Sequence, residues 1–210
     1  TLDFYFESYI VQQKAKPFKS LIDAKVSDLK GKPDVSLCAS APEFRIVDRD
    51  MIESFVKRGF QIDQIQMWIL ERFAYGLNTV MIDYDYILID NPPALGLLTI
   101  NAFTASDSLI LPVSTGYFAL AGLVQLQETI NMVRSTQLNP DLKILGVLCT
   151  FAERTNVSRD VESQLRQYFG DLVFQTSIPK NVSLEEAHSN HTHVFDYAPH
   201  SAGAKAYKQV

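Results

Sequence analysis

The apolar residues of this chain fall into two patterns, short continuous runs and longer stretches in which they recur every three or four positions. A short continuous run is typical of a buried parallel strand, because neighbouring layers cover both of its faces. Recurrence at helical spacing is typical of a helix with one buried face. Strands are predicted at residues 35–40, 86–90, 108–113, 143–150 and 173–178. Helices are predicted at residues 18–29, 48–57, 63–76, 95–105, 118–135, 156–169 and from 202 onward.

The order of these elements predicts an α/β fold. Strands alternate with helices along most of the chain. Connections that contain a helix favour parallel strands joined by right-handed crossovers. We therefore predict a doubly wound, mostly parallel sheet flanked by helices. No repeat, low-complexity tract or linker divides the chain, so residues 1–210 are predicted to form a single α/β domain.

Composition narrows the class of protein further. Hydrophobic residues make up 47% and charged residues 20% of the 210 residues, which is ordinary for a globular domain and argues against disorder. The net charge of −5 means that any contact with nucleic acid must come from a local basic patch. No apolar run reaches the roughly 18 residues that a membrane span needs, so a cytoplasmic protein with no membrane partner is expected. Cys38 and Cys149 both lie in strand-like runs and are expected to be buried thiols.

Asp90 is the leading candidate for chemistry. It directly follows the apolar run at residues 86–89, and Pro92 and Pro93 come shortly after it. A carboxylate at the carboxyl end of a parallel strand lies where open α/β sheets bind ligands, and it can hold Mg²⁺ against nucleotide phosphates. The prolines stiffen the loop that follows. The alternative is an ordinary strand end with an Asp that caps a helix.

Six separate stretches together resemble the ParA-type partition ATPases, a group of deviant Walker-type P-loop proteins. The run Tyr-Ile-Leu-Ile-Asp-Asn-Pro-Pro-Ala-Leu-Gly at 86–96 resembles the family's Walker B and switch region, and Ile-Pro-Lys-Asn-Val-Ser-Leu-Glu-Glu-Ala at 178–187 resembles its nucleotide-side loop. The other four similar stretches are 97–102, 116–123, 154–159 and 197–207. They follow the family's order over roughly residues 84–210, whereas residues 1–80 match poorly.

The resemblance implies an ATP-driven switch in plasmid or chromosome partitioning. It implies ATP and Mg²⁺ as cofactors, a homodimer closed around ATP, a ParB-like partner that stimulates hydrolysis, and non-specific DNA of the nucleoid as a further partner. The protein would then be cytoplasmic and associated with the nucleoid. Asp90 corresponds to the family's aspartate on the Mg²⁺ side, in a catalytic and metal-binding role.

The resemblance also implies roles for residues beyond Asp90. Pro179 and Asn181 occupy the stretch that holds the adenine base in the family, although Pro and Asn are also common in plain turns. Arg154 matches the family's arginine for non-specific DNA binding, and Arg159 and Lys180 are candidates beside it. The alternative for these basic residues is a solvated helix face. Ser183 stands where the family has a second basic residue, which predicts weaker DNA binding than usual.

One departure from the family concerns its phosphate loop. The family has a Gly-rich loop ending in Gly-Lys-Ser/Thr, whose backbone N–H groups and lysine cradle phosphates. This sequence contains no such loop, so it is expected to lack the first βα unit of a P-loop fold and half of the ATP site. ATPase activity is expected if the full protein supplies that segment. The alternatives are a nucleotide-free ParA-like interaction protein and a MinD-like positioning ATPase.

Overall fold

The computed structural model describes residues 57, 70, 73–78, 81–91, 95–116 and 119–210. The predicted elements at 18–29 and 35–40, and most of those at 48–57 and 63–76, lie outside the described residues. The chain divides into two compact units. The first unit, called the N-terminal unit here, contains residues 1–106 and 135–140, and the second, the C-terminal unit, contains residues 107–134 and 141–210.

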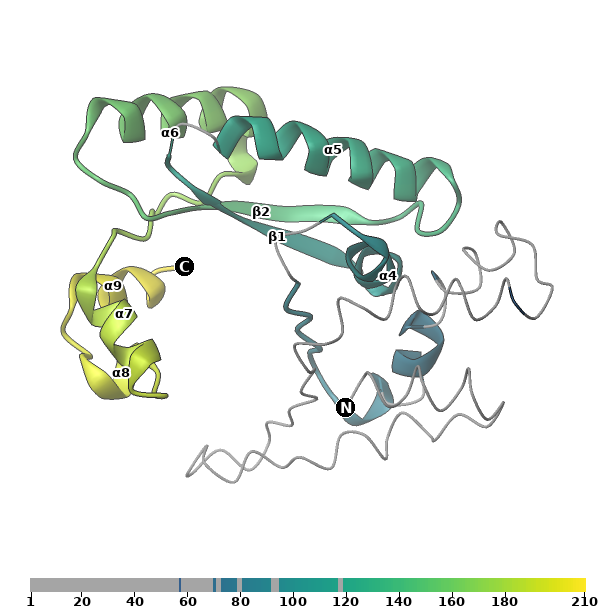
Figure 1. The fold of residues 1–210 in the computed structure, drawn as a ribbon, viewed down its shortest axis with the longest axis horizontal. Helices are drawn as coiled ribbons and strands as arrows, with labels where there is room; N and C mark the ends of the chain where they lie inside the picture. Colours follow the sequence, from purple (N-terminus) through teal and green to yellow (C-terminus); the bar gives the residue numbers. More distant parts are fainter. Residues whose placement is uncertain (1–56, 58–69, 71–72, 79–80, 92–94, 117–118) are drawn as a thin grey trace. The chain divides into compact units, whose positions relative to one another are not determined.

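Two parallel strands form the sheet of the C-terminal unit (Figure 1). Strand β1 (Ser108–Ser114) pairs with strand β2 (Lys143–Thr150), so that Ser114 lies opposite Thr150. Buried and exposed residues alternate along β1, and the buried residues are Leu109, Leu111 and Val113. Both strands lie where the apolar runs predict them, and their parallel pairing confirms that part of the prediction.

Two long helices accompany this sheet. Helix α5 (Ala119–Ser135) connects the two strands, and helix α6 (Asn156–Phe169) follows β2; Figure 1 shows both on the same side of the sheet. Both helices lie within or at the predicted bounds. The fully buried side chains of this unit come from the strands and helices alike, which places its core between the two layers: Ile130, Val133, Leu142, Val147, Cys149, Leu165, Val173 and Ile178.

The predicted strand at 173–178 is irregular in the structure. It runs beside β2, since Phe174 N donates to Val147 O at 2.9 Å and Ile178 N donates to Cys149 O at 2.8 Å. Only isolated parallel bridges form, however, between Val147 and Val173 and between Ala152 and Pro179. The backbone bends between these two bridges and interrupts the ladder, so the prediction of a continuous strand is wrong. The preceding turn is the short 3-10 helix η3 (Gly170–Leu172).

The predicted buried strand at 86–90 is absent. Within the N-terminal unit, the 3-10 helix η2 (Met81–Asp83) leads into an extended segment that belongs to no strand. Tyr86 is 87% exposed and Leu88 is 93% exposed, so these apolar side chains do not lie in a core. A strand needs a neighbour that supplies ladder hydrogen bonds. Because no described strand pairs with this segment, its apolar pattern alone does not make it a buried strand.

Helix α4 (Leu97–Ala105) also belongs to the N-terminal unit and confirms the predicted helix at 95–105. Its buried Asn101 accepts a hydrogen bond from Phe73 N through Oδ1, at 3.4 Å. Asn139 closes the carboxyl end of α4, because its Nδ2 donates to Phe103 O at 2.9 Å and to Ser106 O at 2.7 Å. The Asn139 amide thereby satisfies backbone carbonyl groups that a helix end leaves unpaired.

Three short helices end the chain: α7 (Val182–Ser189), α8 (Val194–Tyr197) and α9 (Ala202–Tyr207). They pack together around Ala187, Val194 and Ala204. Helix α9 confirms the predicted helix from residue 202, whereas α7 and α8 were not predicted. No described helix is both long enough and apolar enough to cross a membrane.

Candidate functional site

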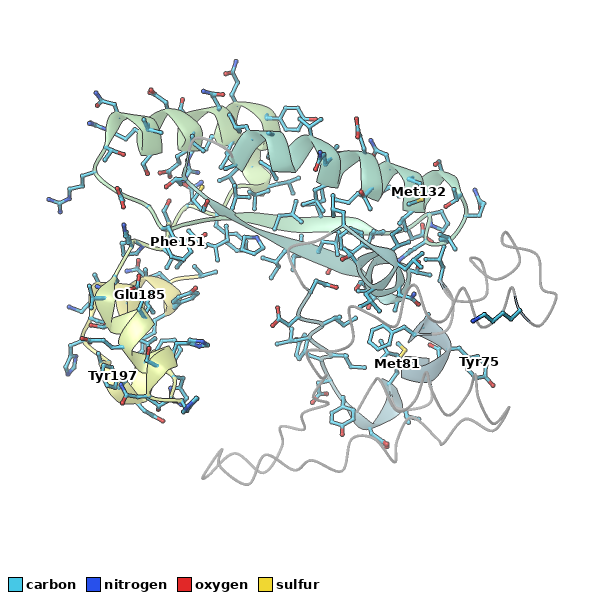
Figure 2. All side chains as sticks on the ribbon, in the orientation of Figure 1. Tyr75, Met81, Met132, Phe151, Glu185 and Tyr197 are labelled. Carbon is cyan, nitrogen blue, oxygen red and sulfur yellow. The ribbon has the colours of Figure 1, made fainter. Side chains whose placement is uncertain are left out.

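The turn at residues 151–155, between β2 and α6, carries Arg154. Because β1 and β2 are parallel, their carboxyl ends meet at one edge of the sheet, and Thr115 N donates to Thr150 O at 3.0 Å there. Figure 2 labels Phe151, the first residue of the turn, which is 58% exposed. Ligands of open α/β sheets bind outside the carboxyl ends of the strands. The turn therefore lies at the edge of the sheet where a ligand is expected.

The amino end of α6 is well capped. Thr155 has an extended backbone conformation, and its hydroxyl accepts a hydrogen bond from Ser158 N at 3.2 Å. Arg159 donates from Nη2 to Asn156 Oδ1 at 2.8 Å, which holds its guanidinium along the first turn of the helix. The helix dipole places partial positive charge at this end, where it favours anions such as phosphate. Thr is one of the residues preferred at the position before a helix, so Thr155 is a recognisable helix start in the sequence.

Arg154 lies on the surface immediately before this cap. Its side chain is exposed, and within the described part of the chain no hydrogen bond or ion pair engages its guanidinium. Arg159 is exposed one helical turn further on. The structure thus places both arginines around the amino end of α6, and their contact with DNA phosphates stays a prediction.

Lys180 lies next to the same turn but is paired. The bridge between Ala152 and Pro179 brings the two segments together, and Lys180 N donates to Ala152 O at 3.1 Å. Lys180 Nζ lies 2.9 Å from Glu153 Oε1. The hydrogen bond that Lys180 donates to Glu153, and then the charge of Glu153, raise the pKa of Lys180 above its ordinary value. An adjacent carboxylate also cancels much of the field of the ammonium, so Lys180 attracts phosphate less than an unpaired lysine does. The sequence did not indicate this pair.

Asn181 has a structural task. Its Oδ1 accepts a hydrogen bond from Ser183 N at 3.2 Å, and it thereby caps the amino end of α7. This matches the reading of the Pro179–Asn181 stretch as a turn, and it leaves the adenine contact a prediction. Ser183, which stands in place of a basic residue, lies in the first turn of α7.

Asp90 lies in the N-terminal unit and is exposed at the end of the extended segment. The prediction that Asp90 lies at the end of a strand is therefore wrong, because no strand is formed at residues 86–90. An exposed carboxylate is still a ligand of the type that Mg²⁺ takes, and Mg²⁺ is commonly held by one or two carboxylates together with substrate phosphates. In the part of the chain that the structure describes, no group of three or more His, Cys, Asp or Glu side chains is placed to hold a metal ion by itself.

A second polar network joins α6 to the segment at residues 173–178. Arg166 donates from Nη2 to Glu162 Oε1 at 2.8 Å and to Phe174 O at 3.0 Å, and Ser177 Oγ donates to the same Glu162 oxygen at 2.9 Å. Burial, and then the charge of Glu162, raise the pKa of the Cys149 thiol above its ordinary value. This network fastens α6 to residues 173–178, and Cys149 is the buried, protonated thiol that its apolar run predicts.

The fold matches those of solved P-loop ATPases. Cobyrinic acid a,c-diamide synthase from Mycobacterium smegmatis, solved with ADP and magnesium, has a TM-score of 0.52 and 32% identity, over 67% of this chain and 50% of that chain. Apo McdA from Cyanthece has a TM-score of 0.69 over 98% of this chain and 81% of that chain, at 15% identity, which shows the fold alone. The predicted class, an α/β fold with a parallel sheet flanked by helices, is thereby confirmed.

Sequence comparison defines the family. The protein-family model described as an AAA domain matches residues 22–144. The sporulation initiation inhibitor protein Soj of Bacillus subtilis (strain 168) is 49% identical over 137 residues, which are 65% of this chain and 54% of Soj. The chromosome partitioning protein ParA of Myxococcus xanthus (strain DK1622) is 43% identical over 137 residues, 65% of this chain and 48% of that protein. The chain belongs to the family of ParA/Soj-type P-loop ATPases, and it spans about half the length of these relatives.

Proposed function

We propose that the protein to which this chain belongs is a ParA-like ATPase that positions a chromosome or plasmid. ATP and Mg²⁺ close a homodimer, the dimer holds non-specific DNA of the nucleoid in the cytoplasm, and a ParB-like partner stimulates hydrolysis and release. The names of the relatives, chromosome-partitioning proteins and ATPases, support the process. The observation that carries the DNA-binding part is the exposed Arg154 on a fixed turn before the capped amino end of α6.

The nucleotide chemistry divides between residues of this chain and a phosphate-binding loop that its sequence does not contain. Bound Mg²⁺ would neutralise charge on the phosphates during an in-line transfer to water. Asp90 would hold the ion directly or through water, and its exposed carboxylate is accessible for that task. Pro179 and Asn181 would contact the adenine base. Hydrolysis is accordingly proposed for a protein that also supplies the phosphate-binding loop.

The DNA contact would be to phosphates and would not read sequence. Arg154 supplies an exposed guanidinium that no described residue engages, and Arg159 together with the helix dipole adds positive potential next to it. Lys180 contributes less because Glu153 pairs with it. With a net charge of −5 the chain as a whole does not attract DNA, so the affinity is proposed to depend on local basic residues such as these. Few phosphate contacts predict a shallow dependence on salt.

The test measures binding of the full-length protein with ATP to a duplex of arbitrary sequence, by fluorescence anisotropy at several salt concentrations. The change Arg154→Ala removes one phosphate contact, so the slope of log K against log salt should decrease in magnitude by about 0.9. The matched control is Lys205→Ala, which removes one positive charge from an exposed position on α9 and should leave the slope unchanged. An unchanged slope for Arg154→Ala would contradict the proposal. The absence of DNA binding by the wild-type protein at low salt would also contradict it.

A nucleotide-free interaction protein built on the same fold is the second candidate. The two candidates separate in a titration of the full-length protein with a fluorescent ATP analogue and Mg²⁺. If the protein is an ATPase, the wild type should bind the analogue saturably and Asp90→Ala should bind it more weakly. If it is a nucleotide-free interaction protein, neither the wild type nor Asp90→Ala should bind the analogue.

A further inference from the structure

Two hydroxyl side chains lie buried beneath the turn that carries Arg154. Thr115, one residue beyond the end of β1, is 4% exposed, and Ser158, in the first turn of α6, is also 4% exposed. Ser158 Oγ donates to Thr115 Oγ1 at 2.7 Å, and Thr115 Oγ1 donates to Phe151 O at 3.2 Å. A buried hydroxyl costs free energy unless it is hydrogen-bonded, and both are: Ser158 donates to Thr115, and Thr115 donates to the Phe151 carbonyl.

This hydroxyl pair fixes the backbone of the turn from inside. Thr115 binds the carbonyl of Phe151, and Ser158 Oγ accepts a hydrogen bond from Glu153 N at 3.1 Å. The residue between them, Ala152, is held from the other side, since its N donates to Ile178 O at 3.0 Å. All three residues that precede Arg154 are therefore hydrogen-bonded through their backbone.

The fixed backbone includes a conformation that most residues avoid. Phe151 has a φ of 51°, in the left-handed region, which is disfavoured for residues with a Cβ atom. Such a conformation persists only where surrounding contacts hold it. The hydrogen bond from Thr115 to the Phe151 carbonyl is one of those contacts, so loss of the Thr115 hydroxyl would let the turn relax.

We propose that the Thr115–Ser158 hydroxyl pair positions Arg154 for its contact with DNA phosphate. This inference rests on the DNA-binding function proposed above. Neither hydroxyl reaches the surface, and both act through the turn. A guanidinium on a preformed turn loses less conformational entropy when it binds than one on a mobile loop. Thr115 and Ser158 are therefore positioning residues, and Arg154 is the contact residue.

The test uses Thr115→Val, which keeps the shape of the side chain and removes the hydroxyl. In the full-length protein with ATP, its affinity for non-specific duplex DNA should fall by about 3- to 10-fold, the range expected from one lost hydrogen bond. The slope of log K against log salt should stay at the wild-type value, because the same phosphates are contacted. Thr115→Ser, which keeps a hydroxyl, should restore most of the affinity.

A double-mutant cycle separates positioning from general loss of stability. In the Arg154→Ala background, Thr115→Val should cause no further loss of affinity, because the residue that it positions is gone. An equal loss in both backgrounds, or wild-type affinity of Thr115→Val alone, overturns the positioning role while leaving DNA binding intact. Absence of DNA binding by the wild type overturns the proposed function and this inference with it. If Thr115→Val does not fold, Ser158→Ala serves in the same cycle.

Discussion

Gly146 lies in β2 directly beneath the ring of Phe174, and this contact makes a quantitative prediction. A Cβ atom added at Gly146 would lie 2.4 Å from Phe174 Cε2 and 3.0 Å from Cζ. Phe174 is partly buried against Leu148, Ile178 and Ala206, so its ring has little room to withdraw. Gly146→Ala therefore forces the ring or the strand to shift.

The size of the effect follows from two opposing terms. Overpacking of this kind costs about 1–3 kcal/mol. Replacing Gly by Ala in a regular element recovers roughly 0.5–1 kcal/mol of backbone entropy. The net loss should be about 1–2 kcal/mol, which in a protein of this size lowers Tm by roughly 2–8 °C. Phe174 also supplies the carbonyl that Arg166 binds, so the end of α6 should lose protection from hydrogen exchange as well.

The assay is thermal and urea unfolding of Gly146→Ala beside a matched control. Gly122 lies in α5 with nothing within 4 Å of an added Cβ, so Gly122→Ala should raise stability by about 1 kcal/mol. The double variant Gly146→Ala with Phe174→Leu should be less destabilised than the two single changes added together. Equal stability of Gly146→Ala and wild type, or strict additivity in the double variant, would refute the packing argument.

Two further predictions concern charge. Glu153→Gln should release Lys180 for phosphate contact, so DNA affinity measured by fluorescence anisotropy should rise and the slope of log K against log salt should steepen by up to about 0.9. The control is Glu128→Gln, which removes a negative charge from the exposed face of α5. An unchanged slope for Glu153→Gln would count against the pairing of Lys180 with Glu153. Burial raises the pKa of the Cys149 thiol above its ordinary value of 9.0, so the folded state keeps its proton where the unfolded chain has lost it. The stabilisation is complete below pH 9 and is lost as pH rises through the folded-state pKa. Urea unfolding at pH 8 and pH 10 should show a larger decrease for wild type than for Cys149→Ala, and parallel decreases would contradict this assignment.

The sequence predicts an element well where the element finds its partners within the same unit. Strands β1 and β2 and helix α6 follow their apolar patterns, because consecutive parts of an α/β chain cover one another. The run at 86–90 has an equally strong apolar pattern, yet it is extended and exposed, since a pattern specifies only that burial is favourable and not that a neighbouring strand is present. Helix α7 was missed because its short sequence carries no clear apolar stripe, and its start depends on the Asn181 cap.

In the candidate site, too, the sequence predicts the arrangement of neighbouring residues and does not predict contacts between distant ones. Arg159 was predicted as a candidate beside Arg154, and local sequence determines that they lie close together, because both are within one helical turn of the Thr155 cap. The pairing of Lys180 with Glu153 and the contact of Thr115 with Ser158 join residues far apart in the sequence. Such contacts depend on how β1, β2 and the segment after α6 align at one edge of the sheet. No local pattern contains that information.

The parallel pairing of β1 with β2 has a consequence for synthesis on the ribosome. Parallel strands cannot be joined by a tight hairpin, and here the whole of α5 must be made between them. At about 5–20 residues per second, β1 emerges seconds before the strand that completes its ladder. During that interval its alternate apolar side chains and its unpaired backbone edge face the solvent, where a chaperone or another nascent chain can bind them. The turn that presents Arg154 takes shape only after β2 and α6 have followed, so a truncated translation product would display the strand without the proposed DNA contact.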